Sequence, residues 1–281
     1  MAKPSVTQIQ IKRFSDSAFD SKPDILAIEE PMEIRLTWFE NSKPIEKSIA
    51  VAMRTPGNDL ELALGFLFTE GIINSKVDID KIWHCETVEK EEEKGNVIKV
   101  NLKPDIEFDF TKQERHFYTS SSCGVCGKAS IESVNQNCSV IPNDNFKVNA
   151  SEIKKLTTAL EAEQTVFKYT GGIHASALFN SKGVLIATRE DVGRHNALDK
   201  IAGWTLENKM TPLNESILLV SGRASFELVQ KAIMLGIPVL CAVGAPSNLA
   251  VDLAKANNMT LIGFLKTDRF NIYTGENRIL L

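Results

Sequence analysis

Residues 216–243 read SILLVSGRASFELVQKAIMLGIPVLCAV, and this stretch decides the fold. Two short apolar runs, 216–221 and 238–243, have the length and composition of buried strands. The segment between them, 224–235, carries apolar residues at helical spacing. A strand, a helix and a second strand in this order predict a parallel strand pair covered by the helix.

The same alternation continues on both sides of this unit. We expect helices over 151–164, 194–208 and 247–257, and strands over 173–179, 184–188, 260–265 and 271–274, with a hairpin turn at 180–183. Strands that alternate with helices of this length predict a largely parallel sheet covered on both faces. Residues 151–281 should therefore form one α/β/α domain.

The order of these elements is that of the cytidine deaminase-like fold, a three-layer α/β/α sandwich. Zinc deaminases of this fold carry His-x-Glu where the second strand meets its helix, and Pro-Cys-x-x-Cys one unit later. Here the two places hold EDVGRHN (190–196) and SGRASFE (221–227), without the metal-binding cysteines and without a glutamate two residues after His195. We expect the scaffold to be kept without zinc, which argues against a nucleotide deaminase.

The first part of the chain has a different composition. Residues 1–117 should form a smaller β-rich subdomain with one helix, which begins near the turn at 55–59 and ends at Gly71. Its strands are expected around 8–12, 24–28, 34–38, 47–53, 79–88 and 97–102. Residues 118–150 would be a cysteine loop and a linker between the two parts.

The cysteine loop reads YTSSSCGVCGKASIE (118–132), with Cys123 and Cys126 three positions apart. The segment 128–134 is expected to be helical, which would place Cys126 near a helix N-terminus, where the thiolate is favoured. A thiol pKa lowered from about 8.5 to about 7 would leave roughly half of the thiol ionised at pH 7. Such a pair can be half a zinc site, a redox pair or a sulfur-handling nucleophile. A zinc site is disfavoured because no second Cys-x-x-Cys or close histidine pair supplies the remaining ligands.

Composition narrows the functional classes. The chain has 281 residues and a net charge of −4, so no general affinity for nucleic acid or membranes is expected. No apolar run reaches the ~20 residues of a membrane span, and no secretory signal is visible. Five cysteines are an odd number, which favours the reducing cytoplasm over a disulfide scaffold. We expect Cys85, Cys138 and Cys241 to be buried structural thiols.

Five stretches together resemble the FdhD/NarQ family, the sulfur carriers required for formate dehydrogenase activity. They are SSCGVCG (121–127), YTGGIH (169–174), REDVGRHNALDK (189–200), SGRASFE (221–227) and GFLKTDRFNIYT (263–274). They span most of the chain. The combination of the run around Asp191 with the cysteine loop is highly specific.

The resemblance implies both a reaction and its partners. Members of the family accept persulfide sulfur from a cysteine desulfurase. They pass it to the molybdenum (or tungsten) bis(molybdopterin guanine dinucleotide) cofactor before insertion into formate dehydrogenase. The resemblance implies that Cys123 carries the persulfide and that the chain forms a homodimer. Because Cys126 is only three positions away, we expect it to assist or protect the persulfide.

The resemblance also implies a cofactor-binding stretch near the C-terminus, and the residues themselves indicate where phosphates would lie. The implied stretch is Phe264, Leu265, Lys266, Thr267, Asp268 and Arg269, and position 266 is more often arginine in the family. Further candidates, expected where strands meet helices at one edge of the sheet, are Gly172, His174, Asp191, Arg194, His195 and Arg223. The simpler interpretation is a tight turn with a core histidine and ordinary helix starts with surface arginines.

Two classes of function therefore stay open. The first is a sulfurtransferase-type carrier that acts on the pterin cofactor. The second is a non-catalytic chaperone that binds the cofactor and the apoenzyme while its cysteines regulate it. The division of labour between Cys123 and Cys126 is open in the first class.

Overall fold

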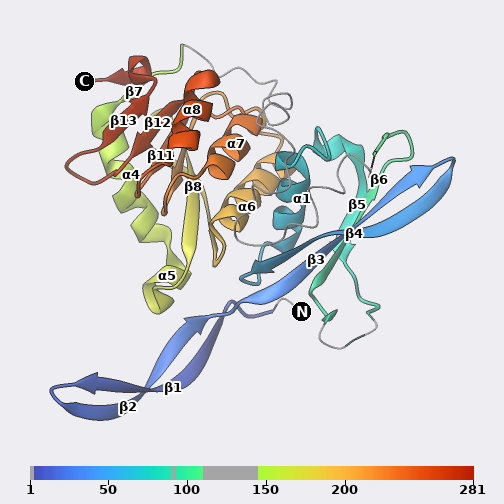
Figure 1. The fold of residues 1–281 in the computed structure, drawn as a ribbon, viewed down its shortest axis with the longest axis horizontal. Coiled ribbons are helices and arrows are strands. Elements are labelled where there is room, and N and C mark those ends of the chain that lie inside the picture. Colours follow the sequence, from blue (N-terminus) through green and yellow to red (C-terminus); the bar gives the residue numbers. More distant parts are fainter. Residues whose placement is uncertain (1–2, 89, 91–92, 110–144) are drawn as a thin grey trace.

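The computed structural model describes residues 3–88, 90, 93–109 and 145–281. The predicted helix over 128–134 and three of the cysteines, Cys123, Cys126 and Cys138, lie outside these residues. Figure 1 shows a layered part formed by the C-terminal half, a second part around a strongly curved strand pair, and a two-stranded arm that extends from them.

The C-terminal half contains a six-stranded sheet in the order β13-β12-β11-β10-β8-β9. Its strands are β8 (His174–Asn180), β9 (Leu185–Asp191), β10 (Ser216–Val220), β11 (Val239–Ala242), β12 (Thr260–Gly263) and β13 (Asn271–Thr274). The pairs β10–β11 and β11–β12 are parallel, whereas β8 is antiparallel to both neighbours and β13 is antiparallel to β12. The expectation of a largely parallel sheet is therefore wrong. The sheet is mixed, because a tight hairpin joins β8 to β9 and the chain reverses again after β12.

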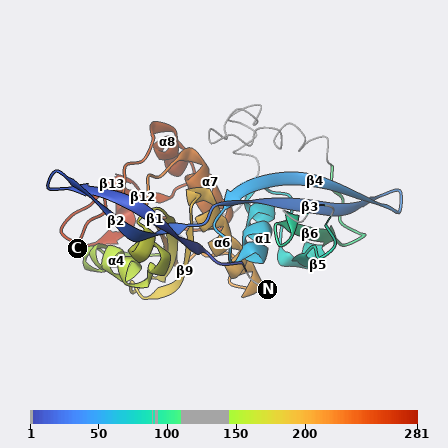
Figure 2. The same cartoon turned by 90° about the horizontal axis from the view of Figure 1, so that it is seen from below.

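Helices cover both faces of this sheet, as expected. They are α4 (Ala150–Glu163), α6 (Arg194–Glu207), α7 (Phe226–Met234) and α8 (Asn248–Ala256). Alternate residues of β10 divide between the faces: Leu218 packs in the core with α6, α7 and α8, and Leu219 packs in the core with α4. Figure 2 shows α4 and α8 on opposite sides of the sheet. The cytidine deaminase-like assignment itself stays a prediction.

The first part of the chain is β-rich with one helix, as the sequence predicts. The arm consists of β1 (Val6–Ser15) and β2 (Ala18–Ala27), and a four-stranded sheet has the order β4-β3-β6-β5. The elements of this part are β3 (Glu30–Glu40), β4 (Lys43–Arg54), α1 (Asp59–Thr69), the 3-10 turn η1 (Lys76–Asp78), β5 (Ile79–His84) and β6 (Val97–Leu102). Gly71 follows the helix with a φ of 71°, the left-handed conformation that ends many helices.

The remaining elements are short. They are β7 (Val148–Asn149), α5 (Thr165–Thr170), the 3-10 turn η4 (Glu276–Arg278) and β14 (Ile279–Leu280). Periodicity did not indicate α5, because six residues with β-branched members give no helical pattern. It ends at Gly171, whose φ is 63°.

Helices α1 and α6 join the two parts of the chain by direct backbone contact. A Cβ atom on Gly65 would lie 1.8 Å from the Asp199 carbonyl oxygen, and one on Gly203 would lie 1.9 Å from the Glu61 carbonyl oxygen. One core cluster contains Trp38 of β3, residues of α1 and residues of α6. The two predicted subdomains thus share a core, and their exact boundaries stay a prediction.

This contact leads to a prediction about stability. Gly65→Ala or Gly203→Ala should lower the free energy of unfolding by about 1–3 kcal/mol or more, because the added methyl group forces the helices apart. Urea unfolding followed by circular dichroism measures this change. Gly172→Ala is the control, since its Cβ would come no closer than 3.8 Å to another atom. Variants as stable as the wild type would mean that the helices do not approach this closely.

Candidate functional site

Five strand ends meet along one edge of the six-stranded sheet. Because β10, β11 and β12 are parallel, their carboxyl ends lie together, and antiparallel β8 begins at the same edge. His174 at the start of β8 pairs with Asp191 at the end of β9. We call this surface the junction edge. It comprises residues 171–174, 191–195, 221–224, 243–246 and 263–269.

Backbone hydrogen bonds make the junction edge continuous. The Phe264 N–H donates to the Gly244 carbonyl (3.0 Å), and the Gly244 N–H donates to the Gly222 carbonyl (3.0 Å). At the next strand the Ser221 N–H donates to the Ala175 carbonyl (2.9 Å). The loops therefore hold one another in a fixed row, which is a suitable support for a ligand at the strand ends.

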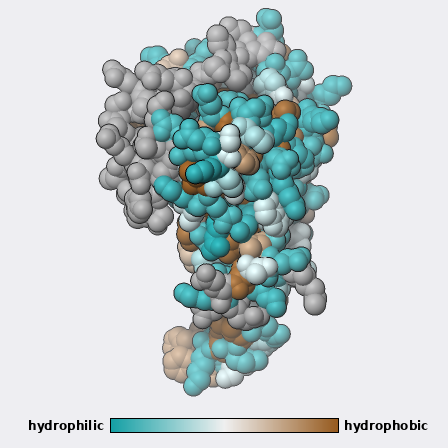
Figure 3. Space-filling view, turned by 90° about the vertical axis from the view of Figure 1, so that its right-hand side faces the viewer, coloured by the Kyte–Doolittle hydropathy of each residue, from teal (hydrophilic) through white to brown (hydrophobic). Residues whose placement is uncertain are grey.

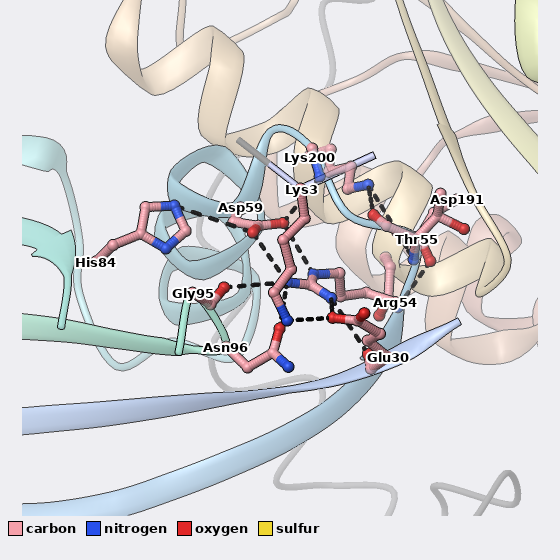
Figure 4. A network of polar contacts seen from close by, with 12 residues as sticks. Lys3, Glu30, Arg54, Thr55, Asp59, His84, Gly95, Asn96, Asp191 and Lys200 are labelled. Carbon is pink, nitrogen blue, oxygen red and sulfur yellow. Dashed lines mark hydrogen bonds and ion pairs between the residues drawn. The ribbon is translucent and has the colours of Figure 1, made fainter. Parts of the chain in front are cut away.

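Asp191 lies at the base of this row, fully buried. Its carboxylate accepts hydrogen bonds from the Thr55 N–H (3.2 Å), the Gly193 N–H (2.8 Å) and the Asn196 side chain (2.9 Å), and it forms an ion pair with Lys200 (2.7 Å). Figure 4 shows Thr55, Asp191 and Lys200 grouped where the loop after β4 meets α6. This geometry gives Asp191 a positioning role, because it fixes the backbone from which α6 begins.

A second buried group holds the other end of the same loop. Arg54 is completely buried and donates to both carboxylate oxygens of Asp59 (2.9 and 3.0 Å) and to Asn96 Oδ1 (2.9 Å). It thereby connects the end of β4, the first turn of α1 and the start of β6 (Figure 4). The loop between Arg54 and Asp59 is thus anchored on both sides, and its hydrogen bonds to Asp191 are fixed in turn.

His174 lies half-buried at the centre of the junction edge. Burial lowers the pKa of His174 below its usual value, the neighbouring Arg194 and His195 lower it further, and Asp191 raises it. Gly222 faces the ring, and a Cβ there would lie 3.5 Å from Nδ1. The neutral imidazole is therefore favoured, and it can both donate and accept a hydrogen bond at this surface.

His195 is oriented by a carboxylate that sequence reasoning missed. Its Nε2 lies 2.7 Å from a carboxylate oxygen of Glu227 and 3.4 Å from Ser225 Oγ. The hydrogen bond from His195 holds the pKa of the Glu227 carboxyl below its usual value, although partial burial opposes this. Glu227 is the last residue of SGRASFE, so the motif contained it, but no spacing rule linked it to His195.

Arg194 and Arg223 are the two guanidinium groups of the junction edge. Neither forms a hydrogen bond or ion pair with any residue that the structure describes, and Arg223 is exposed. Gly244 allows the Arg223 backbone to approach, because a Cβ on this glycine would lie 3.2 Å from Arg223 Cα. Two unpaired guanidinium groups beside the start of α6 make this surface suitable for a phosphate or another anion.

The C-terminal stretch contributes in two ways. Leu265 is buried and can offer only its backbone, whereas Phe264 is 45% exposed. Phe264 has a φ of 51°, a strained conformation for a bulky residue. The Lys266 N–H donates to the Arg269 carbonyl (2.8 Å), and the side chains of Lys266, Thr267, Asp268 and Arg269 are exposed.

The predicted binding residues all lie at the junction edge, including exposed Gly172. Among them, Asp191 and Leu265 have buried side chains that support the surface. The two predicted catalytic cysteines, Cys123 and Cys126, lie outside the described residues. Cys85 and Cys241 are buried as expected, and burial raises the pKa of the Cys241 thiol.

Among the described residues, no group of three or more histidine, cysteine, aspartate or glutamate side chains is placed to hold a metal ion. No helix in the same residues is long and apolar enough to span a membrane.

Comparison with known proteins gives consistent matches. The sequence profile of the FdhD/NarQ family matches residues 27–280. The chain is 46% identical over 275 residues to "Sulfur carrier protein FdhD" of Streptomyces coelicolor, covering 97% of this chain and 95% of the relative. It is 41% identical over 274 residues to the protein of the same name from Saccharolobus solfataricus, covering 98% of each chain.

A solved structure has the same fold. It is the crystal structure of a protein assigned as a formate dehydrogenase accessory protein from Desulfotalea psychrophila, and it superimposes with a TM-score of 0.73 at 24% identity. The match covers 99% of this chain and 100% of the other. The mixed α/β arrangement with several sheets is therefore shared over the full length.

Proposed function

Because the chain belongs to the FdhD/NarQ family, we propose that it is a sulfur carrier that serves formate dehydrogenase. Relatives with 46% identity over nearly their whole length carry the name of sulfur carrier, which supports this role. The observation that carries the cofactor part of the proposal is the pair of guanidinium groups of Arg194 and Arg223, which have no partner among the described residues. They lie at the edge where five strand ends meet.

The proposed chemistry places the sulfur on Cys123. In loading, the Cys123 thiolate attacks the terminal sulfur of a persulfide on a cysteine desulfurase. The donor S–S bond breaks, the donor leaves as a thiolate, and no net oxidation occurs. The glycines of the cysteine loop, and the helix that the sequence predicts over 128–134, favour an accessible, reactive thiol.

Delivery uses the second cysteine. The Cys126 sulfur attacks Cys123 Sγ, the outer sulfur leaves as hydrogen sulfide with the proton that Cys126 gives up, and a Cys123–Cys126 disulfide remains. The two thiols thus supply the two electrons that reduce the sulfane sulfur. A dithiol reductant restores the pair afterwards. The sulfide is received by the molybdenum of the bis(molybdopterin guanine dinucleotide) cofactor, which is the cargo rather than a resident group.

The guanine nucleotide part of this cargo is proposed to bind at the junction edge. Arg194, Arg223 and the N–H groups at the start of α6 would contact the phosphates, and exposed Phe264 offers a ring for stacking. His174 and His195 at the same edge would supply further hydrogen bonds. The carrier would act in the cytoplasm with the desulfurase and apo-formate dehydrogenase as partners, since its thiols must stay reduced.

The sulfur role is tested by mass. After incubation with a cysteine desulfurase and cysteine, the protein should gain about 32 Da, one sulfur atom, and Cys123→Ala should gain nothing. Cys123→Ala should also fail to activate formate dehydrogenase while its thermal midpoint is unchanged, because a loop thiol contributes little packing. Cys126→Ala is the matched control and should still acquire the adduct. Full activation by Cys123→Ala in a strain without its own carrier would favour the non-catalytic chaperone.

The nucleotide role is tested by calorimetry. Arg194→Ala and Arg223→Ala should each weaken GDP binding by roughly 10- to 100-fold, because each loses a charge-assisted hydrogen bond worth about 1.5–3 kcal/mol. Lys182→Ala is the control. Lys182 lies in the β8–β9 hairpin turn, at the ends of these strands that are farthest from His174 and Asp191. Equal binding by all three variants would place the nucleotide elsewhere.

A further inference from the structure

Two charged pairs connect helices α6 and α7. In the first pair His195 Nε2 lies 2.7 Å from a carboxylate oxygen of Glu227. One helical turn further, in the second pair, Lys231 Nζ lies 3.0 Å from both carboxylate oxygens of Asp199. His195 and Asp199 are four positions apart on α6, and Glu227 and Lys231 are four positions apart on α7. Both pairs therefore lie on the same face of each helix.

The second pair fixes how the two helices lie against each other. Its side chains are almost fully buried, 7% exposed for Lys231 and 3% for Asp199. Lys231 also donates to Thr69 Oγ1 (2.8 Å) and pairs with Glu70 (2.9 Å) at the end of α1. Moving α7 along α6 would leave a buried charge without its partner, which is strongly unfavourable. Glu227, one turn before Lys231, is thereby held in place on α7.

The first pair is more exposed and lies beside the junction edge. The side chains of His195 and Glu227 are 27% and 26% exposed, on the first turns of α6 and α7. The second ring nitrogen of His195, Nδ1, points away from the carboxylate that Nε2 contacts. Among the described residues, Nδ1 has no hydrogen-bond partner. This atom is therefore available to a ligand at the junction edge.

Glu227 determines which atom of His195 changes on protonation. An ionised carboxylate can only accept a hydrogen bond, so Nε2 carries a proton in both states of the ring. The hydrogen bond from His195 holds the pKa of the Glu227 carboxyl below its usual value, although partial burial opposes this, so the carboxylate is charged wherever a histidine titrates. The proton that the ring gains or loses is therefore the one on Nδ1.

We propose that Glu227 is a positioning residue that makes His195 Nδ1 a pH-dependent contact for the phosphates of a nucleotide. The neutral ring presents a lone pair at Nδ1, which a phosphate oxygen avoids. The imidazolium ring instead donates a charge-assisted hydrogen bond to the phosphate. Affinity for the nucleotide therefore rises as the pH falls. This inference rests on the proposed nucleotide binding at the junction edge and assigns the residues that make it pH-dependent.

The charged groups around the first pair leave this pH dependence to His195. On the side of α1, Glu70 is already paired with Lys231. Arg194 stays protonated, as arginine does throughout this range. Burial lowers the pKa of His174, and the neighbouring Arg194 and His195 lower it further, so His174 is mostly neutral above about pH 6.5.

Two other surfaces could take a nucleotide without using His195. A cleft of about 790 Å³ runs along β9, but each of its three cations, Lys3, Arg189 and Lys200, is paired with a carboxylate. The arm ends in Phe14 and Phe19, which are 62% and 72% exposed. The lower end of the molecule in Figure 3 shows brown and pale brown side chains among hydrophilic ones. Binding at either surface would be indifferent to the first pair.

Calorimetry with GDP at two pH values tests the proposal. From about pH 8.5 to about pH 6.5, the affinity of the wild type should rise roughly five- to tenfold more than that of His195→Ala, because the wild type gains a charge-assisted hydrogen bond. His195→Ala supplies the baseline, since protonation of the phosphate itself is retained there. Glu227→Gln can still accept the Nε2 hydrogen bond but carries no charge to favour the imidazolium ring. It should lose at least half of the extra rise.

A double variant shows whether Glu227 acts through His195. Adding Glu227→Gln to His195→Ala should change the GDP affinity by less than about twofold, because the ring that Glu227 positions is gone. Nitrogen-15 NMR should find the neutral His195 ring with its proton on Nε2, and Glu227→Ala should give a mixture of both tautomers. A purely structural role of Glu227 would leave the tautomer unchanged.

The matched control is Glu207→Gln, which removes the same charge at the other end of α6. It should keep the affinity and the pH dependence of the wild type. Phe14→Ser with Phe19→Ser should keep them as well. Circular dichroism and the thermal midpoint verify that each variant folds.

The outcomes separate this proposal from the nucleotide role itself. Binding that needs Arg194 and Arg223, but whose pH dependence is the same in the wild type and in Glu227→Gln, would overturn this proposal alone. An effect of Glu227→Gln that persists in full on His195→Ala would also overturn it. A wild type that binds no GDP would overturn the nucleotide role and this proposal together.

Discussion

The direct backbone contact between α1 and α6 is the constraint on which the rest of the structure depends. Gly65 and Gly203 leave no room for a side chain, so the two helices fix the β-rich part against the layered part. The same α6 begins at Arg194, directly after the buried Asp191. The position of the junction edge is therefore set by packing that lies well away from it.

Charge is distributed unevenly around this edge. The cations behind it are neutralised in place, as Lys200 is by Asp191 and Arg54 by Asp59. Lys231, deeper between α1, α6 and α7, is likewise paired with Asp199 (3.0 Å). Burial alone would lower the pKa of Lys231, but the nearby carboxylates raise it overall. Arg194 and Arg223 remain at the surface without described partners, so the positive potential is directed outward, where an anionic ligand gains most from it.

Much of this arrangement could be predicted from the sequence. The strand 97–102 and the helices 194–208 and 247–257 can be predicted because each has a clear period of apolar residues and buries them. The strand 8–12 alternates in sequence as well, although almost all of its residues are exposed in the arm. The grouping of Gly172, His174, Arg194 and Arg223 followed from their places at strand ends. The mixed direction of the sheet did not follow, because strand polarity depends on pairing partners far apart in the chain rather than on local pattern.

Other features needed the three-dimensional structure. The carboxylate of Glu227 meets His195 across 32 positions of sequence, and the role of Asp191 as a buried anchor depends on Thr55, far earlier in the chain. The six residues of α5 have no helical periodicity. The sequence of the arm indicates two strands, but nothing in it predicts that they extend from the rest of the protein. The reactions proposed for Cys123 and Cys126 rest on the sequence and the family, since both lie outside the described residues.

The central claim is that the junction edge receives the nucleotide end of the cofactor. The most direct measurement is a crystal structure of the protein soaked with GDP. The account predicts the diphosphate between Arg194 and Arg223, with the base toward Phe264 and His174 within hydrogen-bonding distance of the ligand. GDP bound in the cleft along β9, or absent from the junction edge at saturating concentration, would contradict it.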